Sequence, residues 1–273
     1  MKHETFVVVT GVSGRMGQML IKTIDEFDRI KLVGAIEQPG HSWVGTDLGI
    51  ALGRNARGII VADKLDEAFA MADAILDFTT PQSSVIFAHK ASHFGIAHVI
   101  GTTGITKNQL VEVKKAAKKT TIVRAGNMSL GVNLLVKLTK QVAKALDTDF
   151  DIEVIEAHHN KKVDAPSGTA LMLGEAAAEG RGQPLEKITD KDRNTFSGVR
   201  KNGDIGFVSI RGGDIVGEHD VLFASPAERI TLRHVAQSRD VFARGAIKAA
   251  EWAKNKAPGE YDMLDVLGLN SEI

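Results

Sequence analysis

The first half of this 273-residue chain alternates short apolar, β-branched runs with segments that have the apolar period of a helix. Residues 5–10 form the first such run, and the apolar positions of residues 16–27 recur at helical spacing. The same alternation predicts strands at 30–36, 74–78, 96–100 and 121–123, and helices at 65–71, 83–93 and 107–118. Short apolar strands separated by helices are typical of a parallel sheet covered on both faces. We therefore expect an α/β fold with a Rossmann-like, doubly wound parallel sheet.

The pattern changes after about residue 128. It predicts a long helix at 130–146, a strand at 151–157, a helix at 169–178, and three successive strands at 205–211, 215–223 and 229–235. Consecutive strands favour a second, α+β domain with a mixed or antiparallel sheet. Residues 180–204 are rich in glycine and charge and predict a long surface loop. A last helix at 241–254 is expected to return to the first domain, which gives boundaries of 1–128 with 240–273, and 129–239.

Composition excludes several classes of function. Lys plus Arg and Asp plus Glu both total 34, so no bulk positive field attracts nucleic acid or an anionic membrane. The absence of cysteine excludes disulfides, thiolate metal sites and a cysteine nucleophile. The N-terminus fits neither a signal peptide nor a membrane span. We expect a cytoplasmic protein with no nucleic-acid or membrane partner.

A glycine-rich turn joins the first predicted strand to the first predicted helix. Gly11, Gly14 and Gly17 are three residues apart, and Ser13 stands where a strict dinucleotide fingerprint has glycine. Glu37 follows Gly17 by twenty residues, at the end of the second predicted strand, where a carboxylate can bind a ribose diol. The alternative is a plain tight turn, but the flanking pattern favours a site for a dinucleotide pyrophosphate at the helix N-terminus.

Small and hydroxyl residues follow three later strands, at 77–81, 101–104 and 125–128. Ligands of open α/β sheets bind outside the carboxyl ends of the strands, so these segments are predicted to line one crevice. Taken singly, each is also an ordinary turn, because glycine and threonine are common there.

The richest segment for chemistry is 156–170, which runs from a strand through two histidines and two lysines into a helix. Histidine can donate a proton near neutral pH, and a nearby lysine can stabilise negative charge or act as the acid itself. Ser167, Gly168 and Thr169 would offer donors to a carboxylate at a helix N-terminus. The segment therefore predicts a site for a small anionic molecule.

Two other interpretations of this segment remain. The histidines can simply end a strand with satisfied hydrogen bonds, and Ser167 or Thr169 can simply cap the helix. A zinc site of His158, His159 and Asp164 would need ligands on one side, whereas adjacent strand residues point to opposite faces. We expect no metal.

On residues 156–170, together with 11–17, 77–81, 101–104, 127–133, 206–207 and 213–219, the chain resembles the dihydrodipicolinate reductases. The resemblance runs from end to end, and the stretch from His158 to Ala170 makes it specific. It implies NAD(P)H-dependent reduction of 4-hydroxy-tetrahydrodipicolinate, a cyclic dicarboxylate, with loss of water to tetrahydrodipicolinate, in diaminopimelate and lysine biosynthesis. It also implies a homotetramer built on the sheet of the second domain.

The resemblance also implies roles for individual residues. His158 would donate the proton and Lys162 would assist it and bind substrate. His159, Ser167, Gly168 and Thr169 would hold the substrate carboxylates in the second, substrate-binding domain. The cofactor would be held in the first, dinucleotide-binding domain by Gly11, Val12, Ser13, Gly14, Arg15, Met16, Glu37, Gly101, Thr102, Thr103, Ala125, Gly126, Asn127 and Met128.

One departure from the family concerns the cofactor. Well-known members follow the equivalent of Glu37 with an arginine that can reach a 2′-phosphate, whereas this chain has Gln38 and then Pro39. A neutral amide lacks the charge-assisted contact that favours NADPH, so we expect a preference for NADH. Arg15 or Arg54 are the alternatives for supplying the missing charge.

Competing functions fit less well. A semialdehyde dehydrogenase that works through a thioester needs a cysteine, which this chain lacks. Short-chain dehydrogenases need Tyr-x-x-x-Lys, and the single tyrosine, Tyr261, is followed at that spacing by Asp265. A non-catalytic NAD(H)-sensing regulator would need a DNA-binding element, which neither the neutral charge nor a helix-turn-helix pattern supports.

Overall fold

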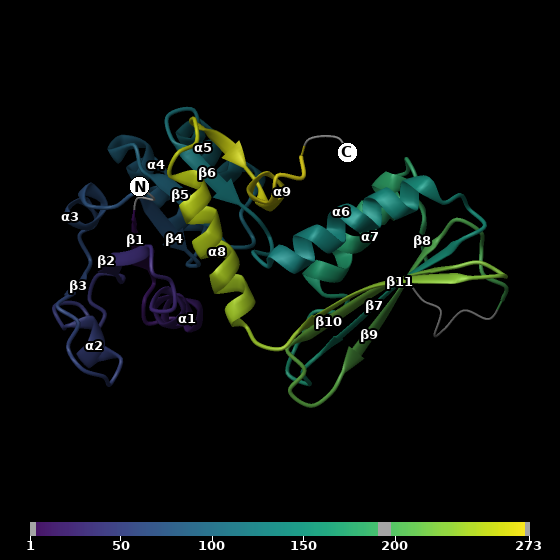
Figure 1. Cartoon of the computed structure of the whole chain (residues 1–273), viewed down its shortest axis with the longest axis horizontal. Coiled ribbons are helices and arrows are strands. Elements are labelled where there is room, and N and C mark those ends of the chain that lie inside the picture. The colour runs from purple at the N-terminus through teal and green to yellow at the C-terminus, as the bar shows by residue number, and fades with distance from the viewer. Residues whose placement is uncertain (1–3, 191–197, 271–273) are drawn as a thin grey trace. The chain divides into compact units, whose positions relative to one another are not determined.

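The computed structural model describes residues 4–190 and 198–270, which form two compact units (Figure 1). Unit 1 contains the described residues up to Ser129 and those from Asp240 onward, and unit 2 is Leu130–Arg239. Each unit has a sheet and a hydrophobic core of its own.

Unit 1 is built on a seven-stranded sheet in the order β12-β6-β5-β4-β1-β2-β3, in which every pair of neighbours is parallel. Its strands are β1 (Thr5–Thr10), β2 (Ile30–Ile36), β3 (Val61–Ala62), β4 (Ala74–Asp77), β5 (Ala97–Ile100), β6 (Thr121–Arg124) and β12 (Gly259–Tyr261). Its helices are α1 (Arg15–Ile24), α2 (Leu48–Ala51), α3 (Leu65–Ala70), α4 (Pro81–Phe94), α5 (Lys107–Ala117), α8 (Asp240–Ala253) and α9 (Met263–Leu267). The predicted Rossmann-like sheet is confirmed.

Helices cover both faces of this sheet, which is why its central strands are apolar on both sides (Figure 1). Val8 and Ile75 face the core formed with Phe69 of α3 and Phe87 of α4. Helix α8 packs beside α1 and against β4 and β5. The sequence pattern did not predict β12, but Arg124 on β6 holds that strand through ion-paired hydrogen bonds of 2.9 and 3.1 Å to Glu260.

Unit 2 has a five-stranded mixed sheet in the order β11-β10-β7-β9-β8. Its elements are α6 (Leu130–Ala145), β7 (Asp151–His158), α7 (Gly168–Gly180), the 3-10 helix η1 (Leu185–Lys187), β8 (Thr189–Asp190), β9 (Ile205–Arg211), β10 (Gly217–Ala224) and β11 (Arg229–Ala236). Strand β10 is antiparallel to β7 and β11, whereas β9 is parallel to β7 and β8. The mixed sheet is confirmed, but successive strands β9 and β10 are not neighbours, because β7 lies between them.

The predicted long surface loop at 180–204 contains two short regular elements in its first part. Pro184 precedes η1, and β8 then pairs with the start of β9 through Thr189 opposite Ile205. Elements of two or three residues leave no period for a sequence pattern to detect. Residues 191–197 of this predicted loop lie outside the described residues.

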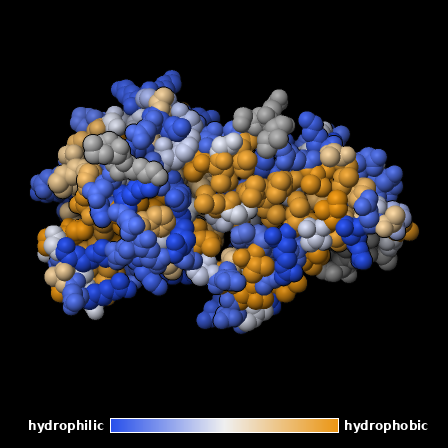
Figure 2. All heavy atoms as spheres, viewed as in Figure 1, coloured by the Kyte–Doolittle hydropathy of each residue, from blue (hydrophilic) through white to orange (hydrophobic). Residues whose placement is uncertain are grey.

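One face of the unit 2 sheet carries the core and the other does not. Ile152 and Val154 of β7 and Phe223 of β10 pack with residues of α6 and α7. On the opposite face, β9 leaves Val208 and Ile210 44% and 48% exposed. A second apolar stretch runs along the outer side of α6, where Leu134 and Leu138 are exposed (Figure 2).

Candidate functional site

The glycine-rich turn of unit 1 has the geometry of a dinucleotide turn. Gly11 adopts a φ of +66°, in the left-handed region, and its N–H donates to the carbonyl of Ile36 at 2.8 Å. A Cβ on Gly17 would lie 2.8 Å from Val12 Cα and overlap the carbonyl oxygen of Gly11. The backbone of α1 can therefore approach β1 closely, and Gly14 begins the helix without a side-chain cap.

Glu37 lies at the end of β2 and faces this turn. Its Oε2 accepts hydrogen bonds from Ser13 N at 3.0 Å and Ser13 Oγ at 2.7 Å, and its Oε1 accepts from Gln38 N at 2.9 Å. Burial alone would raise the pKa of Glu37, but these hydrogen bonds and the nearby His41 hold it below its usual value. Glu37 is therefore an ionised acceptor at the place that the sequence predicts for a ribose contact.

A buried carboxylate joins the ends of β4 and β5. Asp77 Oδ1 accepts from Thr79 Oγ1 at 2.6 Å and Thr79 N at 3.0 Å, and its Oδ2 lies 3.1 Å from His98 Nε2. Thr79 N also donates to Thr102 Oγ1 at 3.0 Å. Burial would raise the pKa of Asp77, but His98 and the hydroxyl donors keep it below its usual value. The predicted segments 77–81 and 101–104 are thus held together by a charge that the sequence pattern did not single out.

The remaining predicted cofactor residues differ in exposure. Val12, Thr102, Ala125 and Met128 are buried in unit 1, whereas Gly14, Arg15, Thr103 and Gly126 are exposed. Gly11, Ser13, Met16, Gly101 and Asn127 are partly buried. The exposed members are accessible to a ligand, whereas the buried members lie inside unit 1.

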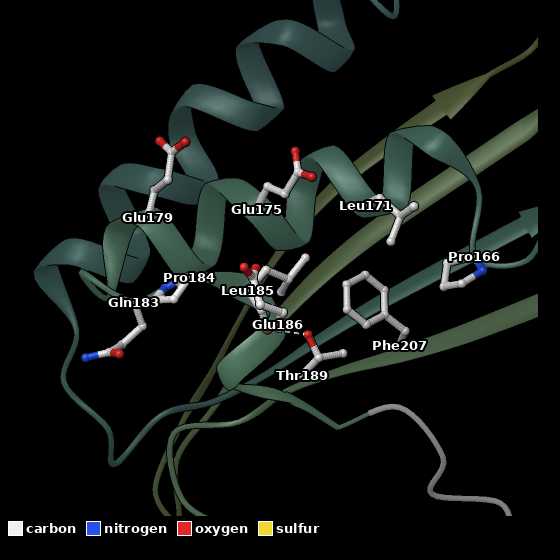
Figure 3. Close-up of a pocket in the computed structure, with 10 residues that line it drawn as sticks. All are labelled: Pro166, Leu171, Glu175, Glu179, Gln183, Pro184, Leu185, Glu186, Thr189 and Phe207. Atoms are coloured by element: carbon white, nitrogen blue, oxygen red, sulfur yellow. Dashed lines mark hydrogen bonds between the residues drawn. The ribbon is translucent and has the colours of Figure 1, made fainter. Parts of the chain in front are cut away.

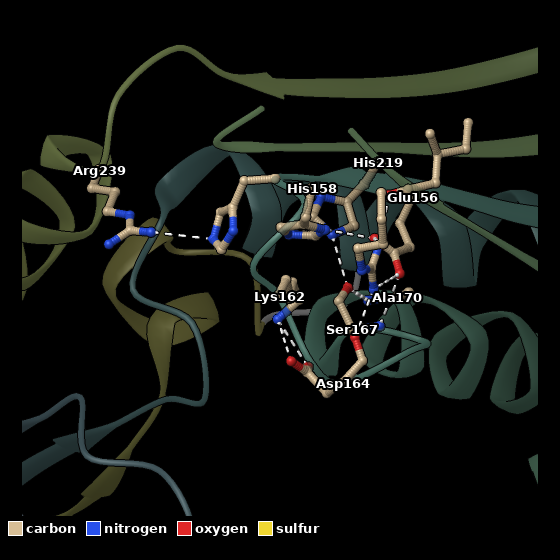
Figure 4. A network of polar contacts seen from close by, with 11 residues as sticks. Glu156, His158, Lys162, Asp164, Ser167, Ala170, His219 and Arg239 are labelled. Carbon is tan, nitrogen blue, oxygen red and sulfur yellow. Dashed lines mark hydrogen bonds and ion pairs between the residues drawn. The ribbon is translucent and has the colours of Figure 1, made fainter. Parts of the chain in front are cut away.

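In unit 2 the end of β7 carries a connected polar network (Figure 4). Glu156 is fully buried, and its Oε2 lies 2.5 Å from His158 Nδ1. Arg211, at the end of β9, donates to both carboxylate oxygens, from Nη1 at 2.8 Å and from Nη2 at 2.7 Å. The network forms because β9 is parallel to β7 with His158 opposite Arg211.

The network shifts the pKa values of its members in opposite senses. Burial alone would raise the pKa of Glu156, but hydrogen bonds with Arg211, Ser209 and His158 lower it to about 2. Burial lowers the pKa of His158, Glu156 raises it, and the charges of Lys162 and Arg211 lower it, with a net result below its usual value. Glu156 is therefore ionised, and His158 is a stronger acid than a free imidazolium.

Ser167 and a second histidine complete this network. Ser167 Oγ caps α7 by accepting from Ala170 N at 3.1 Å, and it lies 3.1 Å from His219 Nε2 (Figure 4). Ser167 N donates to Glu156 at 3.2 Å. The hydroxyl and N–H of Ser167 are thus engaged within the protein, whereas Gly168 has open space around its Cα.

The other predicted residues of this segment lie around the network. Lys162 Nζ is 2.8 and 2.9 Å from the two carboxylate oxygens of Asp164. His159 has a different partner, because its Nε2 lies 3.4 Å from Arg239 Nη2. Thr169 follows Gly168 in the first turn of α7. Sequence reasoning missed Arg239, since nothing near it in the chain points to His159.

A separate cavity lies beside α7 (Figure 3). It has a volume of about 590 Å³ and is lined by Pro166, Leu171, Glu175, Glu179, Gln183, Pro184, Leu185, Glu186, Thr189 and Phe207. None of the predicted site residues lines it. Within the described residues, no group of three or more metal-ligating side chains converges, and no helix is both long and apolar enough to cross a membrane.

Each of the two units matches a known protein family. Residues 5–128 match the family described as "Dihydrodipicolinate reductase, N-terminus", and residues 131–267 match "Dihydrodipicolinate reductase, C-terminus". A 4-hydroxy-tetrahydrodipicolinate reductase of Roseobacter denitrificans is 64% identical over 96% of this chain and 97% of its own length. One of Ruegeria pomeroyi is 63% identical over 98% of this chain and its full length.

A solved structure shares the fold. The dipicolinate-bound dihydrodipicolinate reductase of Paenisporosarcina sp. TG-14 has a TM-score of 0.78 and 24% identity, and covers 96% of this chain and 98% of its own.

A dinucleotide turn on a parallel sheet, with a histidine and lysine centre on a separate mixed sheet, defines a two-domain oxidoreductase that uses a nicotinamide dinucleotide. The chain belongs to the dihydrodipicolinate reductase family.

Proposed function

We propose that this chain reduces 4-hydroxy-tetrahydrodipicolinate to tetrahydrodipicolinate, with loss of water, in diaminopimelate and lysine synthesis. The observation that carries the proposal is 64% identity over nearly the whole chain to a relative named for that substrate. The ionised network at the end of β7 supports it, because a dicarboxylate substrate needs cationic and N–H donors together with an acid.

Unit 1 holds the dinucleotide in this proposal. The Gly11–Gly17 turn takes the pyrophosphate, and Glu37 takes the ribose hydroxyls in place of its present bonds to Ser13. The reduced nicotinamide, when bound, supplies the hydride. The other contacts come from the exposed backbone of Thr103 and Gly126.

Cofactor preference follows from the residue after Glu37. Gln38 is exposed and neutral, so it offers no cation to a 2′-phosphate, and NADH is the preferred cofactor. The test compares kcat/KM with NADH and NADPH at one substrate concentration series. A tenfold preference for NADPH would contradict this proposal and leave the reaction itself unaffected.

Unit 2 holds and protonates the substrate. His158 donates the proton that follows hydride addition, and its lowered pKa makes the imidazolium a better donor. Lys162 binds substrate beside it and assists the donation. One carboxylate is held by Gly168 and Thr169 at the start of α7 and another by His159, with Arg239 as an additional cation. Ser167 contributes by capping the helix that presents these donors.

We also propose a cytoplasmic homotetramer in which unit 2 forms the contacts between copies. The sheet face opposite α6 and α7 exposes Val208, Ile210 and Val235, and β-strand pairing brings Ile210 and Val235 into one row across the sheet. A second copy of this face would remove that apolar surface from water.

A coupled assay tests the reaction directly. The substrate is generated in the assay by its synthase, and the absorbance of the reduced dinucleotide is followed at 340 nm. The expected result is a steady loss of absorbance that requires both the synthase and this chain. Binding of NADH without any absorbance loss would instead favour a dinucleotide sensor.

A further inference from the structure

We propose that Glu156 is a positioning residue for His158: it holds the imidazole through Nδ1 so that Nε2 is the nitrogen that exchanges the proton, while Arg211 offsets its charge so that the proton can leave. The inference rests on the proposed role of His158 as proton donor. It assigns functions to two residues that are distant in sequence and that meet across the β7–β9 pairing.

Glu156 fixes the orientation of the His158 ring. Glu156 and His158 are two residues apart on β7 and lie on the same face of the sheet. The 2.5 Å contact joins Glu156 Oε2 to His158 Nδ1, and an ionised carboxylate can only accept. Nδ1 therefore carries a proton in both charge states of the imidazole, and Nε2 is left for exchange.

The absence of a side chain at Gly217 leaves space beside His158 Nε2. Strand β10 passes beside the ring at Gly217, and a Cβ there would lie only 3.1 Å from His158 Nε2. Glycine leaves this nitrogen uncovered on the side of β10. Gly217 has no positive φ, so backbone conformation does not require glycine at this position.

Arg211 balances the negative charge of Glu156. A buried carboxylate paired with an imidazole alone would stabilise the imidazolium and retain its proton. Arg211 binds both oxygens of the same carboxylate, and Ser167 N donates to Oε1. The charged and titratable groups that face His158 are therefore Glu156 of β7, Arg211 of β9, His219 of β10, and Lys162 of the following loop, which is itself paired with Asp164.

Two variants shift this balance in opposite directions. Activity that needs the imidazolium falls as pH rises through the pKa of His158. Glu156→Gln removes the negative charge that stabilises the imidazolium. We therefore expect the pH at which activity is half lost to decrease by about one unit, and kcat at pH 7 to decrease by about 10-fold to 100-fold. Arg211→Gln removes the positive charge that compensates the carboxylate, so the pH at which activity is half lost is expected to increase. KM for the dinucleotide is expected to stay unchanged in both.

Two control variants distinguish a loss of His158 positioning from a general loss of structure. Arg233→Gln breaks a more exposed ion pair with Glu218, at 2.6 Å on the other face of the same sheet, and is expected to leave the pH profile unchanged. Arg211→Lys keeps the positive charge, so the midpoint of its pH profile of activity is expected to lie near that of the wild type. This variant also tests the role of the charge if Arg211→Gln fails to fold. Shifts of Glu156→Gln and Arg211→Gln in the same direction would overturn the proposal.

A direct measurement on the ring does not depend on turnover. Histidine-labelled protein is titrated by NMR, and the His158 signals are assigned with His158→Gln. The expected wild-type result is a neutral ring protonated at Nδ1 with a pKa below that of free histidine. The pKa should fall in Glu156→Gln and rise in Arg211→Gln.

A neutral ring protonated at Nε2, or a pKa equal in all three proteins, would overturn the inference. Full activity of His158→Gln would instead remove the proposed donor and leave the NMR result on positioning to stand by itself.

Discussion

At the scale of single residues, the buried histidine His219 links the proposed site to stability. Its ring lies 5.1 Å from that of His158, edge to face, and its Nε2 contacts Ser167 Oγ. Burial, followed by the charges of His158, His234 and Lys162 and partly opposed by Glu156, lowers the pKa of His219 to about 4. His219 is therefore neutral in the folded protein at neutral pH.

This lowered pKa predicts a loss of stability in mild acid. Between pH 6.5 and about 4 the unfolded chain binds a proton at this position that the folded chain does not, so the free energy of unfolding decreases as pH falls. A shift of this size corresponds to about 3 kcal/mol. Urea unfolding at pH 7 and pH 5 should show a smaller pH dependence in His219→Gln than in the wild type. An equal dependence in both proteins would contradict the assignment, since His158 and His234 contribute in the same sense but remain in the variant.

Gly217 gives a second prediction at this scale. Gly217→Ala places a methyl group 3.1 Å from His158 Nε2 and forces the ring to move by a few tenths of an ångström, so we expect kcat to fall about tenfold. Gly212→Ala is the matched control, because its Cβ meets nothing within 4 Å and its φ is not positive. Equal kcat values for the two variants would contradict the role of open space at Nε2.

The residues of the 156–170 segment could be predicted because they are contiguous and their types carry the chemistry. Arg211 and Arg239 could not, because they lie 55 and 80 residues further along the chain than their partners Glu156 and His159. Glu156 was within the predicted segment, but its proposed role depends on the strand pairing that places Arg211 opposite His158, and the sequence does not show this pairing.

At the scale of elements, the turn before α1 is the proposed site for the dinucleotide pyrophosphate in unit 1. The turn, the helix and Glu37 were predictable from spacing, because a strand, a glycine turn and a helix have local signals. The order β10-β7-β9 in unit 2 was not, because sequence patterns identify strands but not their neighbours. A pattern that predicts three successive strands therefore could not reveal that β7 separates the first two.

A substitution at Gly17 tests whether dinucleotide binding needs the close approach of α1 to β1. In Gly17→Ala the new Cβ overlaps the carbonyl of Gly11, so α1 must move away from β1. We expect NADH affinity, measured by fluorescence titration, to fall at least tenfold, and the protein to lose stability. Lys22→Ala, an exposed change on the same helix, should leave both unchanged. NADH affinity retained in Gly17→Ala would show that the turn does not need this close approach.

At the scale of the whole molecule, a chain segment that follows unit 2 completes unit 1. Helix α8 packs on the sheet begun by β1, and a Cβ on Gly245 would overlap the carbonyl of Met128. Composition and periodicity predicted a helix there, but the strand β12 beyond it is too short to detect.

The sheet face of unit 2 that exposes Val208, Ile210 and Val235 is the proposed contact between copies, and its disruption should change the oligomeric state. Light scattering of the wild type should give four times 29.3 kDa. Ile210→Lys places a charge in the proposed contact and should lower the mass, whereas Ile50→Lys, at an exposed position of unit 1, should not. A tetramer retained by Ile210→Lys would exclude this face as the contact.

The proposed role of His158 is to protonate the substrate that this chain reduces. Its most direct test is kcat of His158→Gln in the coupled assay, with NADH binding measured by fluorescence on the same preparation. We predict a kcat at least about 100-fold below that of the wild type with an unchanged dissociation constant for NADH. A variant that retains the full kcat would contradict the account.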